Sequence, residues 1–95
     1  MSQRIDKSWV VFASVEDDDN RCVDFFARPD GTFGFEEFRR DSEDGGRWTP
    51  TQHFSGAAYS SPAQSLGAAE HSVRWLGDVL ARKPLLRDQI RSPAP

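Results

Sequence analysis

The chain has 95 residues, of which 37% are hydrophobic and 28% are charged, and its mean hydropathy is −0.66. This composition predicts one small soluble domain, because about 100 residues leave room for a single core. No segment approaches the roughly 20 apolar residues of a membrane-spanning helix, and the first seven residues lack the apolar run of a secretion signal. We therefore expect a cytoplasmic protein with no membrane partner, one domain over 1–91 and a disordered tail over 92–95.

The formal net charge is −3, and seven of the 15 acidic residues lie in two short runs, Glu16–Asp19 and Asp41–Asp44. Each run is followed by asparagine or glycine, a pattern typical of solvated loops. The isoelectric point near 5.2 argues against general affinity for nucleic acid, which depends on many basic residues. The single cysteine, Cys22, cannot form an internal disulfide or by itself supply the ligands of a zinc site, so we expect a fold without cofactors that depends on its own core.

The first half of the chain predicts strands. Residues 9–15 and 22–27 are rich in β-branched and aromatic side chains, and we expect them to pair as a hairpin. The Arg28–Thr32 segment, with proline and glycine in turn positions, predicts a type I turn closing with a bulge.

Residues 33–39 should form the returning strand, with Phe33, Phe35 and Glu37 on one face and Gly34, Glu36 and Phe38 on the other. A fourth strand is expected between Trp48 and Ser55. Because Pro50 lacks an amide hydrogen, that strand should lie at an edge or begin after the proline.

A helix is predicted from Pro62, because Ser61 can cap it and Gln64 can complete a capping box. Pro84 either breaks this helix or opens a last turn through 84–91, and the sequence does not decide between these alternatives. Apolar residues recur at spacings of three and four along one face, which should cover the sheet: Leu66, Ala69, Val73, Leu76 and Leu80.

The expected class is therefore α+β: an antiparallel three- or four-stranded meander packed on one C-terminal α-helix. Large apolar side chains alternate onto both faces of this sheet, whereas one helix covers only one face. The other face then requires the tail, a second subunit or a ligand, because large exposed apolar patches are uncommon on monomers. A homodimer is the economical explanation; folding back of residues 84–91, or strong sheet twist, is the alternative.

The segment Thr32–Phe38 resembles the core of the RNA-recognition-motif octapeptide, with aromatic matches at Phe33, Phe35 and Phe38. The resemblance implies that Phe33 and Phe35 stack on bases of a single strand. The motif's basic and first glycine positions hold Gly31 and Thr32 instead, and acidic side chains follow, so nucleic acid is the alternative partner. The candidate contact surface consists of Phe33, Phe35, Arg39 and Trp48.

No catalytic or metal-binding constellation is predicted. The run beginning at Asp41 fails the spacing of a calcium-binding EF-hand loop, whose fifth and twelfth positions would be Gly45 and Gln52. The two histidines, His53 and His71, lie in no recognisable nucleophile motif, and Cys22 is expected to be a small buried hydrophobe.

Several longer segments together resemble a group of short bacterial proteins to which no activity is assigned. They are the stretch from Pro29 to Asp41, the Gly46–Pro50 segment, the Tyr59–Ser61 segment and the alanine-rich helix ending at Trp75–Leu76. The resemblance implies the same meander followed by a helix and supplies no site residues. The favoured hypothesis is a small noncatalytic interaction module whose partner is a second copy or another protein. Single-stranded nucleic-acid binding is the alternative, and an enzyme is the third.

Overall fold

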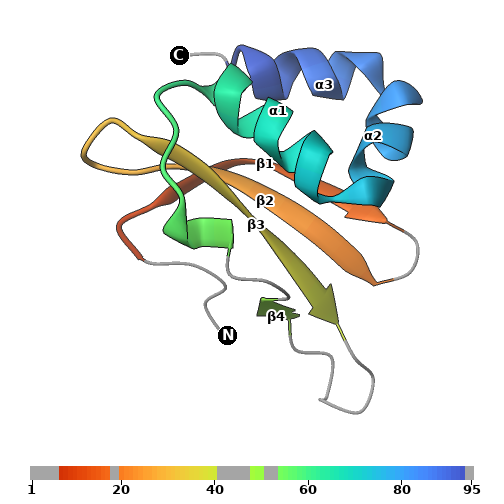
Figure 1. Cartoon of the computed structure of the whole chain (residues 1–95), viewed down its shortest axis with the longest axis horizontal. Coiled ribbons are helices and arrows are strands. Elements are labelled where there is room, and N and C mark those ends of the chain that lie inside the picture. The colour runs from red at the N-terminus through yellow and green to blue at the C-terminus, as the bar shows by residue number, and fades with distance from the viewer. Residues whose placement is uncertain (1–6, 18–19, 41–47, 51–53, 94–95) are drawn as a thin grey trace.

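The computed structural model has an antiparallel sheet with a layer of helices on one face (Figure 1). It describes residues 7–17, 20–40, 48–50 and 54–93. The strands neighbour one another in chain order: β1 (Val10–Asp17), β2 (Arg21–Ala27), β3 (Phe33–Arg40) and β4 (Trp48–Pro50). The predicted α+β class, a meander followed by helix, is confirmed.

The turn between β2 and β3 is the one that its residues predicted. The N–H of Gly31 donates to the carbonyl of Arg28 at 3.1 Å, and the N–H of Arg28 donates to the carbonyl of Thr32 at 2.8 Å. Gly31 has a φ of 88°, which glycine adopts without the steric cost of a Cβ. The Asp30 carboxylate accepts hydrogen bonds from the hydroxyl and the N–H of Thr32, at 2.7 and 3.0 Å. This turn fixes the register in which Phe25 pairs with Phe35.

The fourth strand is present and short. β4 pairs with the end of β3, ends at Pro50 and lies at an edge, as the proline predicted. The continuation of this strand toward Ser55 was predicted through residues 51–53, which lie outside the described ones. A 3-10 turn, η2 (Phe54–Gly56), follows, and Tyr59 then bridges to Phe33.

The expected single helix is divided into three: α1 (Pro62–Ser72), α2 (Arg74–Ala81) and α3 (Pro84–Arg91). The first break falls at Val73, whose φ of −110° and ψ of 100° are extended. Valine disfavours helix because its branched side chain restricts χ1, and its burial at 2% exposure lets packing compensate for the break. The second break precedes Pro84, which occupies the first turn of α3 and so settles the question left open for 84–91.

The start of α1 follows the expected pattern with one change. The Ser61 hydroxyl accepts from the N–H of Gln64 at 3.1 Å, as predicted. The Gln64 side chain reaches back to the N–H of Ser60 rather than that of Ser61, at 3.1 Å. The cap is therefore a box extended by one residue.

The main core lies between the helices and one sheet face. The predicted helical stripe is confirmed, since each of its five residues is at most 3% exposed. Phe25 and Phe35 are their counterparts on the sheet, with ring centroids 6.2 Å apart. Phe54 and Tyr59 pack against Phe35 at the margin of this core, at 5.1 and 6.0 Å.

The opposite sheet face is not the bare apolar surface that was expected. Cys22, Phe26 and Phe38 alternate onto that face, and all are 0% exposed. The Trp9 ring stacks on Phe26, with centroids 4.8 Å apart and planes inclined by 13°. Trp9, which precedes β1, and Arg28, in the turn after β2, thus pack onto the face that the helices leave.

Candidate functional site

The sheet has one long open edge among its described strands, the outer side of β1. β4, at the other edge, has three residues and ends in proline, features by which natural sheets limit edge pairing. The start of β3 is also occupied on that side: Phe33 and Tyr59 exchange backbone hydrogen bonds of 2.8 and 2.9 Å. The eight residues of β1 are thus the backbone that the described sheet offers for strand addition.

The start of β1 exposes apolar surface. Val10 is 65% exposed and Val11 is 39% exposed. The third large exposed apolar residue of the described chain is Leu85, 78% exposed on α3. Two adjacent exposed valines on an open edge strand are typical of a surface that another strand covers.

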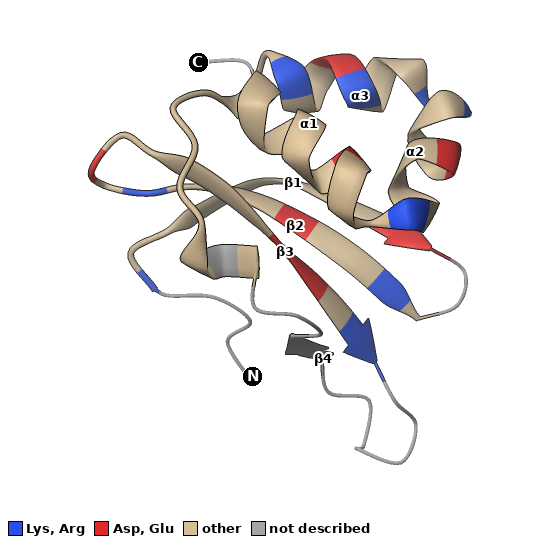
Figure 2. Ribbon diagram, in the orientation of Figure 1, with Lys and Arg blue, Asp and Glu red and all other residues tan. Residues whose placement is uncertain are grey.

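Opposite charges lie at the two ends of β1. Lys7 precedes the strand, and Glu16 and Asp17 end it, as the blue and red segments in Figure 2 show. Asp17 is engaged within the hairpin, accepting from the Arg21 guanidinium at 2.6 Å. Within the described part of the chain, Lys7 and Glu16 are exposed and form no ion pair.

A β-bulge interrupts β1 at Phe12. The pairing with β2 shifts between Val11 and Ala13, so Phe12 is the extra residue. Its ring turns toward the helix side, with centroids 6.5 Å from Phe25 and 6.3 Å from Phe33. A bulge bends its strand, so a partner strand must follow the same bend.

The N-terminal end of β1 is held by a stack of three side chains. The Arg28 guanidinium lies 4.5 Å from the Trp9 ring centroid and 5.0 Å from that of Phe26. It also donates to the carbonyls of Phe33 and Ala57, at 3.1 and 3.0 Å. Cation–π contacts and two backbone hydrogen bonds therefore fix the residues leading into Val10.

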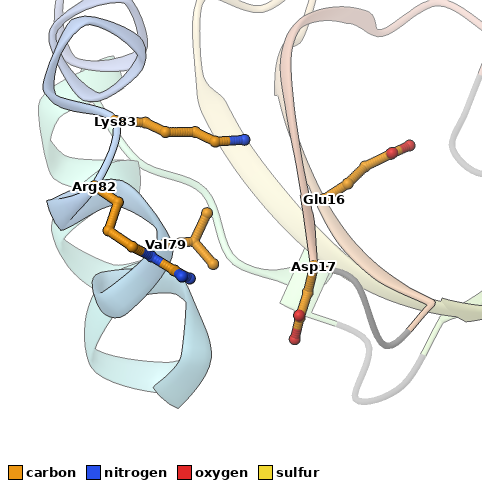
Figure 3. Close-up of a pocket in the computed structure, with 5 residues that line it drawn as sticks. All are labelled: Glu16, Asp17, Val79, Arg82 and Lys83. Carbon is orange, nitrogen blue, oxygen red and sulfur yellow. The ribbon is translucent and has the colours of Figure 1, made fainter.

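A pocket of about 200 Å³ lies at the opposite end of β1, between this strand and the turn joining α2 to α3 (Figure 3). Its volume is below the roughly 300–1,000 Å³ of typical small-molecule sites. The Lys83 side chain extends toward β1, whereas the Glu16 carboxylate points away from the helices (Figure 3). The Glu16 carboxylate is thus directed away from the pocket's basic residues.

Buried acidic side chains lie on both sheet faces, as the alternation of Glu36 and Glu37 predicted. On the helix side, the indole Nε1–H of Trp75 donates to Glu37 at 2.7 Å. On the other side, Ser14 donates to Asp24 at 2.5 Å, and the N–H of Phe54 donates to Glu36 at 3.1 Å. These bonds offset part of the cost of burying carboxylates and link three strands, α2 and η2.

The four predicted contact residues do not form one surface. Phe35 is 1% exposed beneath the helices, and Phe33 is half-buried on the same face. Arg39 is exposed near the far end of β3, and Trp48 begins β4 opposite Arg40; its side chain lies outside the described ones. The helix stripe packs on the face that carries Phe35, so this side chain is part of the core.

The candidates for metal binding and nucleophilic chemistry are placed as follows. In the described ranges, no group of three or more His, Cys, Asp or Glu side chains could hold a metal ion. Cys22 is fully buried, as predicted, and His71 is exposed on α1. His53 and the acidic run from Asp41 lie outside the described residues.

Sequence reasoning missed the surface formed by Val10, Val11, Lys7 and Glu16. Residues 9–15 were recognised as a strand, but only the order of strands reveals that it is an edge. The opposite charges on either side of an apolar strand were the signal that could have indicated it.

No protein-family model, curated protein or solved structure matches this chain. None of the described helices is long and apolar enough to cross a membrane.

Proposed function

We propose that this chain is a small noncatalytic interaction module that self-associates by strand addition at β1. The observation that carries the proposal is the open edge itself, which bears Val10 at 65% exposure and Val11 at 39%. Strand addition gives affinity through backbone hydrogen bonds and specificity through side-chain contacts. The interface expected from the sequence was a sheet face, whereas the interface proposed here is the edge of the sheet at β1.

The sheet's asymmetry supports a closed dimer rather than a filament. A sheet with two long open edges would add copies without limit, whereas this one offers one long edge and the three-residue β4. When two copies pair β1 with β1 about a two-fold axis, the long edge of each copy is occupied, and no long edge is left for a third copy. An eight-residue edge is small beside standard interfaces of about 1,600 Å², so we expect a dissociation constant of about 10 µM to 1 mM.

The proposed location is the cytoplasm. A single, fully buried cysteine is compatible with a reducing compartment and requires no oxidising one. Fractionation of cells producing the tagged chain tests this part of the proposal, and recovery with the membrane or the exported fraction contradicts it.

The alternative of base stacking on 33–38 finds less support in the geometry. A stacking ring must present its face to the ligand. Phe35 lies in the core, and Phe33 lies edge-on to Phe12 at 6.3 Å. The neighbouring Glu36 and Glu37 are buried acids rather than phosphate-binding bases.

Sedimentation equilibrium from about 1 µM to about 1 mM tests the self-association. We expect the wild-type chain to pass from monomer to dimer, and the double variant Val10→Lys/Val11→Lys to remain monomeric, because charged side chains block edge pairing. Leu85→Lys is the matched control, since it makes the same change at an exposed apolar residue on α3. Circular dichroism verifies that each variant is folded.

Two outcomes contradict the proposal: a wild-type chain that remains monomeric throughout, and a folded double variant that dimerises like the wild type. Loss of dimer in Leu85→Lys alone would place the interface on α3 instead.

A further inference from the structure

We infer that the occupant of the β1 edge is a second copy of β1 running antiparallel, with Lys7 of each copy beside Glu16 of the other. The inference rests on the proposed self-association and adds its orientation and its electrostatic determinant. Its basis is the placement of two exposed charges at opposite ends of one open strand.

These two charges cannot pair within one copy. A strand rises about 3.3 Å per residue, so Lys7 and Glu16 stand up to about 30 Å apart. The screening length at physiological ionic strength is about 8 Å, so their attraction within one chain is negligible. Among the described residues neither charge has an ion-pair partner in its own copy, so each can pair with a charge on another copy.

Orientation decides which charges meet. Antiparallel pairing about a two-fold axis brings the basic start of each strand to the acidic end of the other, and symmetry makes this contact twice. Parallel pairing brings Lys7 beside Lys7 and Glu16 beside Glu16, two repulsive contacts. The charge pattern of β1 thus favours one orientation and opposes the other.

Glu16 is the acidic residue available for this contact. Asp17 is bound by Arg21 at 2.6 Å within the same hairpin. The Glu16 carboxylate points away from the helices and from Lys83, as Figure 3 shows. The bulge at Phe12 is compatible with the pairing, because both strands carry the same bend.

Charge reversal at low ionic strength tests the orientation. Lys7→Glu turns two attractive contacts into two repulsive ones, so we expect about tenfold weaker dimerisation. The double variant Lys7→Glu/Glu16→Lys restores opposite charges across the antiparallel interface and should recover the wild-type affinity. Arg74→Glu, an exposed site at the start of α2, changes the net charge equally and should leave dimerisation within about twofold of wild type.

Salt provides a second readout in the same sedimentation measurement. At about 1 M salt the screening length falls to about 3 Å, so wild type and Lys7→Glu should converge. The orientation is overturned if the wild type dimerises but Lys7→Glu matches it at low salt, or if the double variant fails to recover. A wild type that never dimerises instead contradicts the self-association on which the inference rests.

Discussion

Replacing Gly34 with alanine will lower the free energy of unfolding by about 1–3 kcal/mol, because it overpacks the stack that secures the start of β1. A Cβ at Gly34 would lie 2.8 Å from Cε1 of Phe26 and 2.9 Å from Nη2 of Arg28. Both distances are shorter than van der Waals contact. The φ of Gly34 is not positive, so the effect comes from crowding rather than from backbone strain.

Neither neighbour can yield without loss. Phe26 is 0% exposed and stacked on Trp9, so its ring moves only if that stack opens. Arg28 would have to leave the carbonyls of Phe33 and Ala57, and each such hydrogen bond to a charged group contributes about 1.5–3 kcal/mol. Partial adjustment of both side chains accounts for an expected cost within the range for overpacking.

Urea denaturation followed by circular dichroism measures the change, with a slope of about 1–3 kcal/mol/M for a small protein. Gly67→Ala is the matched control: it lies inside α1, is exposed, and a Cβ there meets nothing within 4 Å. Because alanine favours helix over glycine, this variant should gain up to about 1 kcal/mol. The reasoning is refuted if Gly34→Ala is as stable as the wild type, or if both substitutions change stability in the same direction.

Three further predictions concern hydrogen bonds that hold separate elements. Ser61→Ala removes the α1 cap and should lower the free energy of unfolding by about 0.5–2 kcal/mol in the same urea assay. Trp75→Phe removes the 2.7 Å bond to Glu37 and should cost about 1.5–3 kcal/mol, whereas an unchanged midpoint would mean that this bond contributes nothing. The hydroxyl and then the N–H of Thr32 hold the pKa of Asp30 below its usual value. Thr32→Val should therefore raise that pKa in an NMR titration; in the wild type this contribution to stability is present at neutral pH and lost as pH falls through the lowered pKa.

The strands and turns could be predicted because their determinants are local. The turn at Gly31 depends on proline, aspartate and glycine within five residues, and its geometry agrees with the expectation. The short edge strand ending at Pro50 also follows from one residue's missing N–H. Such features require no knowledge of what packs against them.

The division of the helix could not be predicted in the same way. The spacing from Leu66 to Leu80 is compatible with one continuous helix, and all five stripe residues are buried. Val73 nevertheless adopts an extended backbone, and its burial depends on how the helices meet the sheet. Propensity gave only a weak signal there, because tertiary packing determined where the helix ends.

The candidate site shows a similar limit. Strand alternation correctly places Phe25 and Phe26 on opposite faces, but it cannot show what covers the second face. The coverage comes partly from Trp9, which is 17 residues away in sequence from Phe26, the ring on which it stacks, and from Arg28, which lies over both rings. Because one helix was expected to cover only one of two apolar faces, the apolar surface that a partner must cover was overestimated.

An exposed edge is a stronger constraint on partners than an exposed face would have been. A face of aromatic rings accepts many ligands, including a base, a helix or another sheet, because hydrophobic burial is not directional. The edge of β1 presents backbone donors and acceptors in a row, so it selects an extended strand. The unlike charges at its two ends then select that strand's direction. Because the bulge at Phe12 further requires a matching bend, a second copy of β1 satisfies all three constraints with residues already present in this chain.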